Sequence, residues 1–180
     1  MKNFVCQDVI ICFAENKIEK ADFDYFRKYF ILKKPMRKRF VIHEHHATRL
    51  HFDLRLEIGG VLKSWAVPKG VSMNPQEKRL AVAVPDHSVG YIGFEGTLAE
   101  GTYGAGEVRI WDKGEFETSG NAEEQLQKGK LVFTVYGRKL KGEFTLLKMW
   151  NQEKNWLVIK SKDEFADANW KLETVLDAKK

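Results

Sequence analysis

The stretch Arg49–Ile58, RLHFDLRLEI, decides the fold class of this sequence. Apolar side chains occupy every second position, and polar side chains occupy the positions between them. Ten residues of strict period two are typical of a β-strand with one buried face and one polar face. Gly59-Gly60 then predicts a tight turn, with VLKSWAV at 61–67 as the second strand of a hairpin.

Other short segments with strand character lie before and after this hairpin. They are FVIHEH at 40–45, KRLAVAV at 78–84, EVRIW at 107–111, GEFET at 114–118, LVFTVYG at 131–137, EFTLLKMW at 143–150 and NWLVIK at 155–160. Between EVRIW and GEFET, Asp112-Lys113-Gly114 predicts another hairpin turn. So many short strands joined by Gly-rich turns indicate an antiparallel barrel or sandwich. We expect a mainly β fold, a compact antiparallel β-barrel with a few short flanking helices.

Three segments have helical character. Residues 20–30 carry Phe23, Phe26 and Phe30 at helical spacing. The other two are NAEEQLQKG at 121–129, which ends at Gly129, and the tail from Phe165 to Lys180. The chain of 180 residues suits one domain. We expect a single domain over 1–180, with an N-terminal arm or helix at 1–39, a β-barrel core at 40–160 and a C-terminal tail at 161–180.

The bulk composition is that of a globular protein, with 43% hydrophobic and 31% charged residues. The net charge of +5 favours an anionic partner such as nucleic acid. No apolar run reaches the length of about 20 residues that spans a bilayer, and the N-terminus lacks the pattern of a signal peptide. We therefore expect a cytoplasmic protein without membrane contact, in which Cys6 and Cys12 stay reduced and form no zinc site.

Four of the five histidines lie between residues 43 and 51, and Asp53 follows closely. Period two places His51, Asp53 and Arg55 on one face of their strand, and it places His43 and His45 on one face of the preceding segment. If the two segments pair, His45, His51 and Asp53 converge. Two imidazoles and one carboxylate suit a divalent metal such as Mn²⁺, Zn²⁺ or Fe²⁺ and leave positions open for catalysis. A solvated polar face is the ordinary alternative, but it does not account for three candidate ligands together.

Positive charge surrounds this cluster in the sequence. Arg55 shares the polar face, Lys69 follows the partner strand, Arg79 begins another strand, and His87 lies in the loop VPDHSVGY. Each has an ordinary explanation as a surface residue, but together they suit the binding of a phosphoester. The Gly-rich segment at 96–111 leads into a strand, so it is not a Rossmann or Walker motif. It is either a plain β connection or a loop that lets a substrate backbone approach closely.

Three blocks of the sequence resemble a known family. HEHHATRLHFDLRLEIGGVLKSWAVPKG at 43–70, KRLAVAVPDHSVGYIGFEGTLAEGTYGAGEV at 78–108 and WDKGEFE at 111–117 are similar to the 3′-phosphoesterase domain of bacterial DNA ligase D, which also occurs as free-standing proteins. The resemblance is close over about residues 38–118 and looser beyond them. It implies a hydrolase with a β-barrel core that heals DNA or RNA–DNA primer-template 3′ ends in non-homologous end joining. Such an enzyme removes a terminal nucleoside from a ribonucleotide-containing end and then removes the remaining 3′-phosphate.

The resemblance also implies roles for single residues. His45, His51 and Asp53 match the metal ligands of the family, whose cofactor is Mn²⁺, with Co²⁺ or Zn²⁺ as alternatives. The residues that match its catalytic and phosphate-binding positions are Arg55, Lys69, Arg79, His87 and Tyr91. His43 stands where family members often have glutamine, and we expect it to contact substrate rather than to serve as a fourth ligand. The chain has no Lys-x-Asp-Gly adenylation motif, so the partner would be a separate DNA ligase.

One departure and two alternatives stay open. The family uses an arginine and a glutamate in its N-terminal arm, and residues 1–36 offer no clear match, which leaves the balance of the two steps undetermined. A non-haem Fe(II) oxygenase uses the same two-His-one-carboxylate ligand set, but dependence on 2-oxoglutarate or O₂ would distinguish it. A non-catalytic nucleic-acid-binding β-barrel fits the charge and the aromatic content, but it does not explain His45, His51 and Asp53.

Overall fold

The computed structural model of the chain describes residues 5–6, 9–10, 37–99, 101–102 and 104–176. The chain forms two compact units, Met1–Met36 and Arg37–Lys180. In the first unit, the short strands β1 (Val5–Cys6) and β2 (Val9–Ile10) pair antiparallel. The helix predicted at 20–30 lies outside the described residues. Within the described ranges, no helix has the length and apolar character to cross a membrane.

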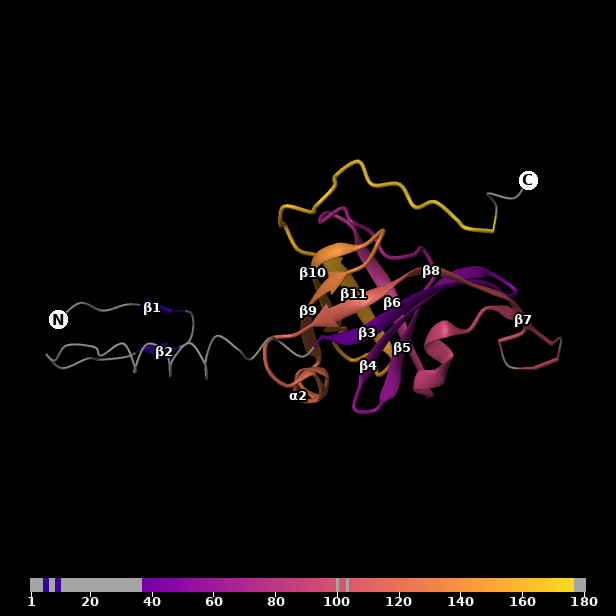
Figure 1. Cartoon of the computed structure of the whole chain (residues 1–180), viewed down its shortest axis with the longest axis horizontal. Helices are drawn as coiled ribbons and strands as arrows, with labels where there is room; N and C mark the ends of the chain where they lie inside the picture. Colours follow the sequence, from indigo (N-terminus) through magenta and orange to yellow (C-terminus); the bar gives the residue numbers. More distant parts are fainter. Residues whose placement is uncertain (1–4, 7–8, 11–36, 100, 103, 177–180) are drawn as a thin grey trace, which may run out of the picture. The chain divides into compact units, whose positions relative to one another are not determined.

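The larger unit is built on one antiparallel sheet. Its strands are β3 (Lys38–His46), β4 (Leu50–Ile58), β5 (Val61–Val67), β6 (Lys78–His87), β7 (Gly96–Leu98), β8 (Gly106–Glu117), β9 (Lys130–Tyr136), β10 (Lys141–Lys148) and β11 (Asn155–Lys160). The spatial order is β3-β4-β5-β6-β11-β10-β9-β8, and the pairing of β3 with β8 closes it into an eight-stranded barrel (Figure 1). Strand β7 adds to β8 outside the closed ring. The predicted antiparallel β-barrel is therefore confirmed.

The hairpin of β4 and β5 follows the predicted alternation on its inner face. Phe52, Leu54 and Leu56 are buried in the core, together with Trp65 and Val67 of β5. Burial of several such side chains, each worth about 1.5–3 kcal/mol, is the main force that fixes the strand register.

The outer face of β4 departs from the expected half-buried strand. Asp53 and Arg55 are each only 4% exposed although they point away from the core. The segment that carries the 3₁₀ helix η2 (Val89–Gly93) and β7 covers this face, since Tyr91 lies over Arg55 and Gly104 contacts His45 (Figure 1). The polar residues of β4 are thus enclosed between the barrel and its covering segment.

The predicted turn at Asp112-Lys113-Gly114 is wrong, because β8 runs without interruption from Gly106 to Glu117. Asp112 is buried and accepts hydrogen bonds from the backbone N–H groups of residues 113 and 138–140. A Cβ at position 114 would collide with Tyr136 O on the adjacent strand. Asp112 and Gly114 therefore allow close contacts between neighbouring segments of the sheet, and they do not form a chain-reversing turn.

The helix α2 (Ala122–Gln127) confirms the prediction for NAEEQLQKG, with Asn121 as its N-cap and Gly129 at φ +78° after its end. The predicted helix in the tail is wrong over 165–176, where turns and extended chain run along the barrel (Figure 1). Besides turn hydrogen bonds within the tail, some of its backbone groups bind residues outside it. Asp167 N–H donates to Met73 O, and Glu173 O accepts from the Trp111 indole.

Candidate active site

The pairing of β3 with β4 brings three candidate ligands together on the outer face of the barrel. His45 is directly opposite His51, and Asp53 is two residues further along β4. One ligand atom from each of His45, His51 and Asp53 lies within 4.8 Å of the others. Asp53 Oδ2 is 3.5 Å from His45 Nδ1, and Asp53 Oδ1 is 3.6 Å from His51 Nε2. The predicted convergence of these residues is present in the structure.

Backbone carbonyls determine which nitrogen of each imidazole faces the cluster. His45 Nε2–H donates to Gly104 O at 2.9 Å, which leaves the lone pair of Nδ1 directed at Asp53. His51 Nδ1–H donates to Arg49 O at 2.9 Å, which leaves the lone pair of Nε2 free. Metal-binding histidines usually have this arrangement, in which the second nitrogen donates to an oxygen and fixes the ring. The donor set and its orientation therefore fit a divalent metal ion.

The environment of Asp53 keeps its carboxylate ionised. Burial alone would raise the pKa of Asp53, but the charge of the adjacent Arg55 holds that pKa below its usual value. Arg55 Nη2 donates to Asp53 Oδ2 at 3.0 Å. An ionised carboxylate beside two neutral imidazoles is the form in which these groups coordinate a metal.

Arg55 is the centre of a second, adjoining cluster. Its Nε donates to His43 Nδ1 at 3.2 Å, and its Nη1 donates to Ser64 Oγ at 2.9 Å. Nη1 also lies 2.9 Å from His87 Nδ1. The guanidinium is thus held in one orientation by neighbours on β3, β4, β5 and β6, next to the metal-ligand group.

His43 is fully buried and is not part of the metal-ligand group. Burial, together with the nearby charge of Arg55, lowers the pKa of His43 to about 4, so its ring is neutral at neutral pH. Its Nδ1 accepts from Arg55, and its Nε2 has no hydrogen-bond partner among the described residues. Its ring meets that of Tyr91 edge-on at 5.6 Å. In this structure His43 contacts the arginine and not the position of a metal.

His87 and Tyr91 complete the cluster around Arg55. The Tyr91 ring lies 5.1 Å from the Arg55 guanidinium and 5.1 Å from the His87 ring, and it stacks on Phe94 at 4.6 Å. Burial and the charge of Arg55 lower the pKa of His87. His87 Nδ1 lies 2.9 Å from both Arg55 Nη1 and Pro85 O, and it accepts from the first only when it carries no proton.

Lys69 and Arg79 lie apart from both clusters. They line a cavity of about 350 Å³ with Pro68, Glu77, Lys78 and Leu80. Arg79 Nη2 donates to Glu77 Oε2 at 2.6 Å, and its Nε is buried without a partner among the described residues. No described contact joins Lys69 or Arg79 to the metal-ligand group. This cavity is linked to the site through the sheet, because Pro68 and Lys69 directly follow β5, and β5 pairs with β4.

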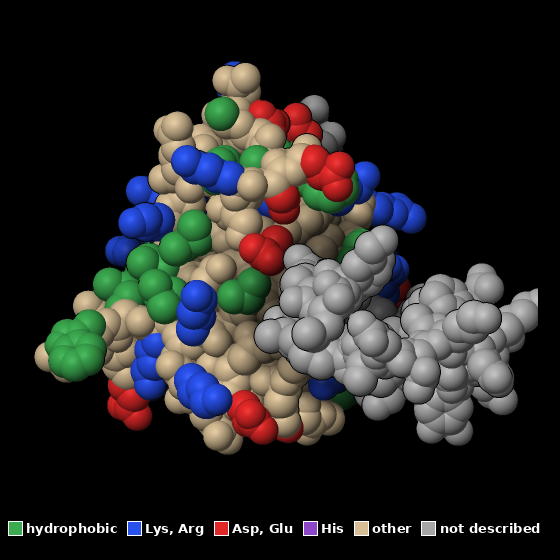
Figure 2. Space-filling view, turned by 90° about the vertical axis from the view of Figure 1, so that its left-hand side faces the viewer, with side chains coloured by type: hydrophobic (Ala, Val, Ile, Leu, Met, Phe, Trp, Pro, Cys, Tyr) green, Lys and Arg blue, Asp and Glu red, His purple; other side chains and the backbone are tan. Residues whose placement is uncertain are grey.

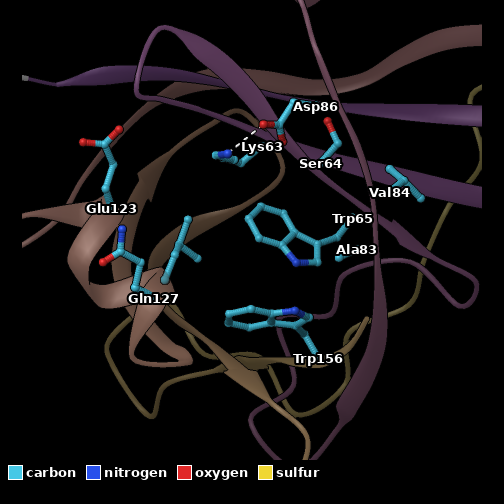
Figure 3. Close-up of a pocket in the computed structure, with 10 residues that line it drawn as sticks. Lys63, Ser64, Trp65, Ala83, Val84, Asp86, Glu123, Gln127 and Trp156 are labelled. Atoms are coloured by element: carbon cyan, nitrogen blue, oxygen red, sulfur yellow. Dashed lines mark hydrogen bonds and ion pairs between the residues drawn. The ribbon is translucent and has the colours of Figure 1, made fainter. Parts of the chain in front are cut away.

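A second cavity, of about 490 Å³, is lined by residues of β5, β6, β11 and α2 (Figure 3). The T-shaped pair of Trp65 and Trp156 and the ion pair of Lys63 with Asp86 line it. Ser64 lines the same cavity, but its hydroxyl binds Arg55. The cavity therefore adjoins the Arg55 cluster without containing any of the three metal-ligand residues.

Comparisons with known proteins agree with this geometry. The pattern of the DNA Ligase D 3'-phosphoesterase domain matches residues 43–148, more than half of the chain. The chain belongs to this family. The "Multifunctional non-homologous end joining protein LigD" of Pseudomonas aeruginosa is 45% identical over 127 residues, which are 69% of this chain and 15% of that protein. The protein of the same name from Mycolicibacterium smegmatis is 44% identical over 132 residues, 70% of this chain and 17% of the relative.

A third relative, the "Multifunctional non-homologous end joining DNA repair protein LigD" of Mycobacterium tuberculosis, is 39% identical over 125 residues, 69% of this chain and 16% of that protein. The chain thus spans about a sixth of the length of these relatives. Membership in the phosphoesterase family indicates a hydrolase domain.

Two features of this phosphoesterase-family site were missed by sequence reasoning. Ser64 could have been found, since a two-residue turn at Gly59-Gly60 pairs Ile58 with Val61 and therefore Arg55 with Ser64. The carbonyl of Gly104, which orients His45, could not, because no sequence pattern signals a backbone contact across 59 residues. Gly104 has φ +80°, a conformation that favours glycine, and this explains one of the glycines in the Gly-rich segment.

Proposed function

We propose that this chain is a metal-dependent phosphoesterase that acts on the 3′ ends of DNA or RNA–DNA strands at breaks. The observation that carries the proposal is the metal-ligand group of His45, His51 and Asp53 beside the buried, fully oriented Arg55. A metal and an arginine side by side provide the two positive charges that a phosphoester needs as its bond to the sugar oxygen breaks. Membership in the 3′-phosphoesterase family supports the same reaction class.

His45 Nδ1, His51 Nε2 and a carboxylate oxygen of Asp53 are the atoms that would hold the metal, for which Mn²⁺ is our first choice and Co²⁺ or Zn²⁺ are alternatives. When bound, the ion acts as a Lewis acid on the phosphoryl group. The ligand set is three protein groups, which matches sites that keep positions free for substrate.

Arg55 and His87 act on the phosphate in this proposal. Arg55 is 4% exposed, and the described contacts occupy four of its five N–H groups, with His43 at Nε, Ser64 and His87 at Nη1, and Asp53 at Nη2. We expect a phosphate oxygen to bind at Nη1. Of these contacts, the one between Arg55 Nη1 and His87 Nδ1 is the easiest to replace, because Pro85 O is a second partner for His87 Nδ1. Once His87 takes up a proton, Nδ1–H donates to Pro85 O instead, and Arg55 Nη1 is released to the phosphate. When a 3′-phosphate is removed, water attacks phosphorus, the bond from phosphorus to the sugar 3′ oxygen breaks, and His87 Nε2–H would protonate that leaving oxygen.

The finer substrate preference is also a proposal. We expect removal of a 3′-terminal nucleoside from a ribonucleotide-containing end, followed by removal of the 3′-phosphate to leave a 3′-OH for a DNA ligase. Lys69 and Arg79 would bind backbone phosphates further along the strand, since they are basic and lie next to the end of β5. Tyr91 would orient the Arg55 guanidinium.

The test is release of phosphate from a primer–template with a 3′-phosphate, in the presence of Mn²⁺ and after chelation. A second primer with a single 3′-terminal ribonucleotide tests the nucleoside-removal step. His46→Gln is the matched control, because His46 follows His45 on β3 but binds Glu44 instead of facing the metal-ligand group. The wild type and this control should release phosphate only with metal. Metal-independent release would contradict the proposal, and binding without any release would favour the non-catalytic barrel.

A further inference from the structure

Glu44 is a buried acidic residue that has no part in the proposed reaction. Acidic side chains usually lie at the surface of a protein, as Figure 2 shows for one face of this one. Among the described residues only Glu44, Asp53 and Asp112 are buried acids, and Glu44 is 0% exposed. Asp53 belongs to the metal-ligand group, and Asp112 binds the loop after β9. Because a buried carboxyl group needs partners for its oxygens, the partners of Glu44 indicate what it does.

The oxygens of Glu44 bind the C-terminal tail. Val175 N–H donates to Oε2 at 2.5 Å, and Leu176 N–H donates to Oε1 at 3.2 Å. His46 Nε2 lies 2.7 Å from Oε1. Glu44 therefore connects β3 to a segment that follows 131 residues later in the chain.

Other contacts hold this part of the tail at the end of the barrel. Trp170 and Leu172 pack against the hydrophobic core. The Trp111 indole donates to Glu173 O at 2.6 Å. A Cβ at Gly70 would collide with the side chain of Leu172. Since these contacts do not involve Glu44, the tail can serve as an anchor to which Glu44 attaches β3.

His45 is supported from both faces of β3. It directly follows Glu44, so the two side chains point to opposite faces of the strand. On the outer face, Gly104 O orients the His45 ring. On the inner face, the tail holds the same part of the backbone through Glu44. This second support lies near the end of β3, which stops at His46, and the ends of strands are where local opening is easiest.

We infer that Glu44 is a positioning residue for the metal ligand His45, and that the C-terminal tail acts on the metal-ligand group through it. The inference rests on the proposed function in one respect, which is that His45, His51 and Asp53 bind a divalent metal. Without the carboxyl group, the N–H groups of residues 175 and 176 lose their acceptor, and the end of β3 loses its anchor. His45 then spends less time in the orientation that binds metal, and the apparent metal affinity falls in proportion.

The test measures Mn²⁺ affinity by calorimetry in the full-length wild type, Glu44→Gln and Val175→Pro. Glu44→Gln keeps the size of the side chain but leaves one oxygen to accept hydrogen bonds. Val175→Pro removes the N–H that reaches Oε2 and changes no charge. The control is Glu107→Gln, which removes a negative charge from the neighbouring strand. Glu107 is opposite His46 on β8, and it pairs with Arg109 and not with the tail.

Glu44→Gln and Val175→Pro should each weaken Mn²⁺ binding about tenfold, the lower end of the range for residues that orient metal ligands. Glu107→Gln should stay within about threefold of the wild type, as expected for an exposed ion pair. Because both test variants break the same contact, the protein that carries both changes should bind Mn²⁺ about as well as the weaker single variant. At saturating Mn²⁺ the variants should recover most of the wild-type rate of 3′-phosphate release, since the three ligands are intact.

Two results would overturn the inference. In the first, urea unfolding shows that both test variants are less stable, but their Mn²⁺ affinity in the folded state equals that of the wild type, so the tail contact only stabilises the fold. In the second, Glu44→Gln and Glu107→Gln bind Mn²⁺ equally weakly and Val175→Pro binds it normally, so the effect is one of charge. If Val175→Pro does not fold, the difference between Glu44→Gln and Glu107→Gln decides.

The same measurements separate this inference from the proposed function. If the wild type binds Mn²⁺ but releases no 3′-phosphate, the proposed function fails, and the order of the Mn²⁺ affinities still decides the role of Glu44. If the wild type releases phosphate with Mn²⁺ and the test variants match its affinity, the role of Glu44 is refuted alone. A wild type that binds no divalent metal would contradict both.

Discussion

Replacement of His43 by glutamine should remove part of the acid sensitivity of the metal-free protein. His43 has a pKa of about 4 in the folded protein, because burial and the charge of Arg55 oppose its protonation. An unfolded chain would protonate the same ring near its ordinary pKa of 6.5. Since the folded pKa is the lower one, the unfolded state binds more protons between these values, and stability falls as the pH falls through this window.

The magnitude follows from the two pKa values. Between about pH 8 and about pH 5, protonation of the unfolded chain at this one ring lowers the free energy of unfolding by about 2 kcal/mol. Glutamine has no titrating group, but its amide oxygen can still accept from Arg55 Nε. Asp53, whose pKa is lowered, loses its contribution only below this window, in more acidic solution. His87 also contributes to the acid sensitivity of both proteins, because its pKa is lowered as well.

The assay is urea unfolding with chelator present, for wild type and His43→Gln, at several pH values from about 8 to about 5. The difference in free energy of unfolding between the two proteins should change by about 2 kcal/mol over this range, with the wild type losing more. In an NMR titration, the histidine resonance that is absent from His43→Gln should not titrate above about pH 5. Parallel pH curves for the two proteins, or a titration midpoint near 6.5 for that resonance, would refute the reasoning about His43.

Three further predictions concern the neighbouring residues. Arg55→Ala should lower activity by at least about a hundredfold with a smaller effect on Mn²⁺ affinity, and Arg55→Lys should recover only part of it; full activity in the lysine variant, measured by phosphate release, would argue against bidentate binding. Asp112→Ala should lower the free energy of unfolding by about 3 kcal/mol or more, because four backbone N–H groups lose their acceptor, and a urea-unfolding difference under about 1 kcal/mol would contradict this. Arg79→Ala should lower kcat/KM about tenfold or more for a 3′-phosphate primer and leave Mn²⁺ affinity unchanged, so weaker Mn²⁺ binding in calorimetry would show that Arg79 acts on the metal site.

Much of the barrel could be predicted because its local signals agree with its long-range contacts. The alternation of Leu50 to Ile58 and the turn at Gly59-Gly60 set both the strand and its register. The same period-two argument placed His45, His51 and Asp53 on adjoining positions, and the structure brings them together. Where a pattern is repeated over several residues, burial of one face selects a single register.

The errors come from residues whose role depends on distant parts of the chain. Asp112 and Gly114 are residue types that favour turns, but here they contact the end of β9 and the loop after it, more than 20 residues later in the chain. The tail lacks a helix because its backbone binds Met73 and Trp111 of the barrel. The enclosure of Asp53 and Arg55 depends on Tyr91 and Gly104, which alternation within β4 cannot reveal. Short-range patterns do not encode such contacts.

The most direct test of the proposed function is to measure metal occupancy and 3′-phosphate release in the same samples of wild type, Asp53→Ala and His51→Ala. Circular dichroism should show that all three proteins are folded, since neither change removes an inner-face side chain. In the wild type, release of phosphate from the primer should rise in proportion to occupancy of one Mn²⁺ site. Both variants should lose the metal and the activity together. A folded Asp53→Ala protein with normal metal content and normal turnover would contradict the assignment of this site.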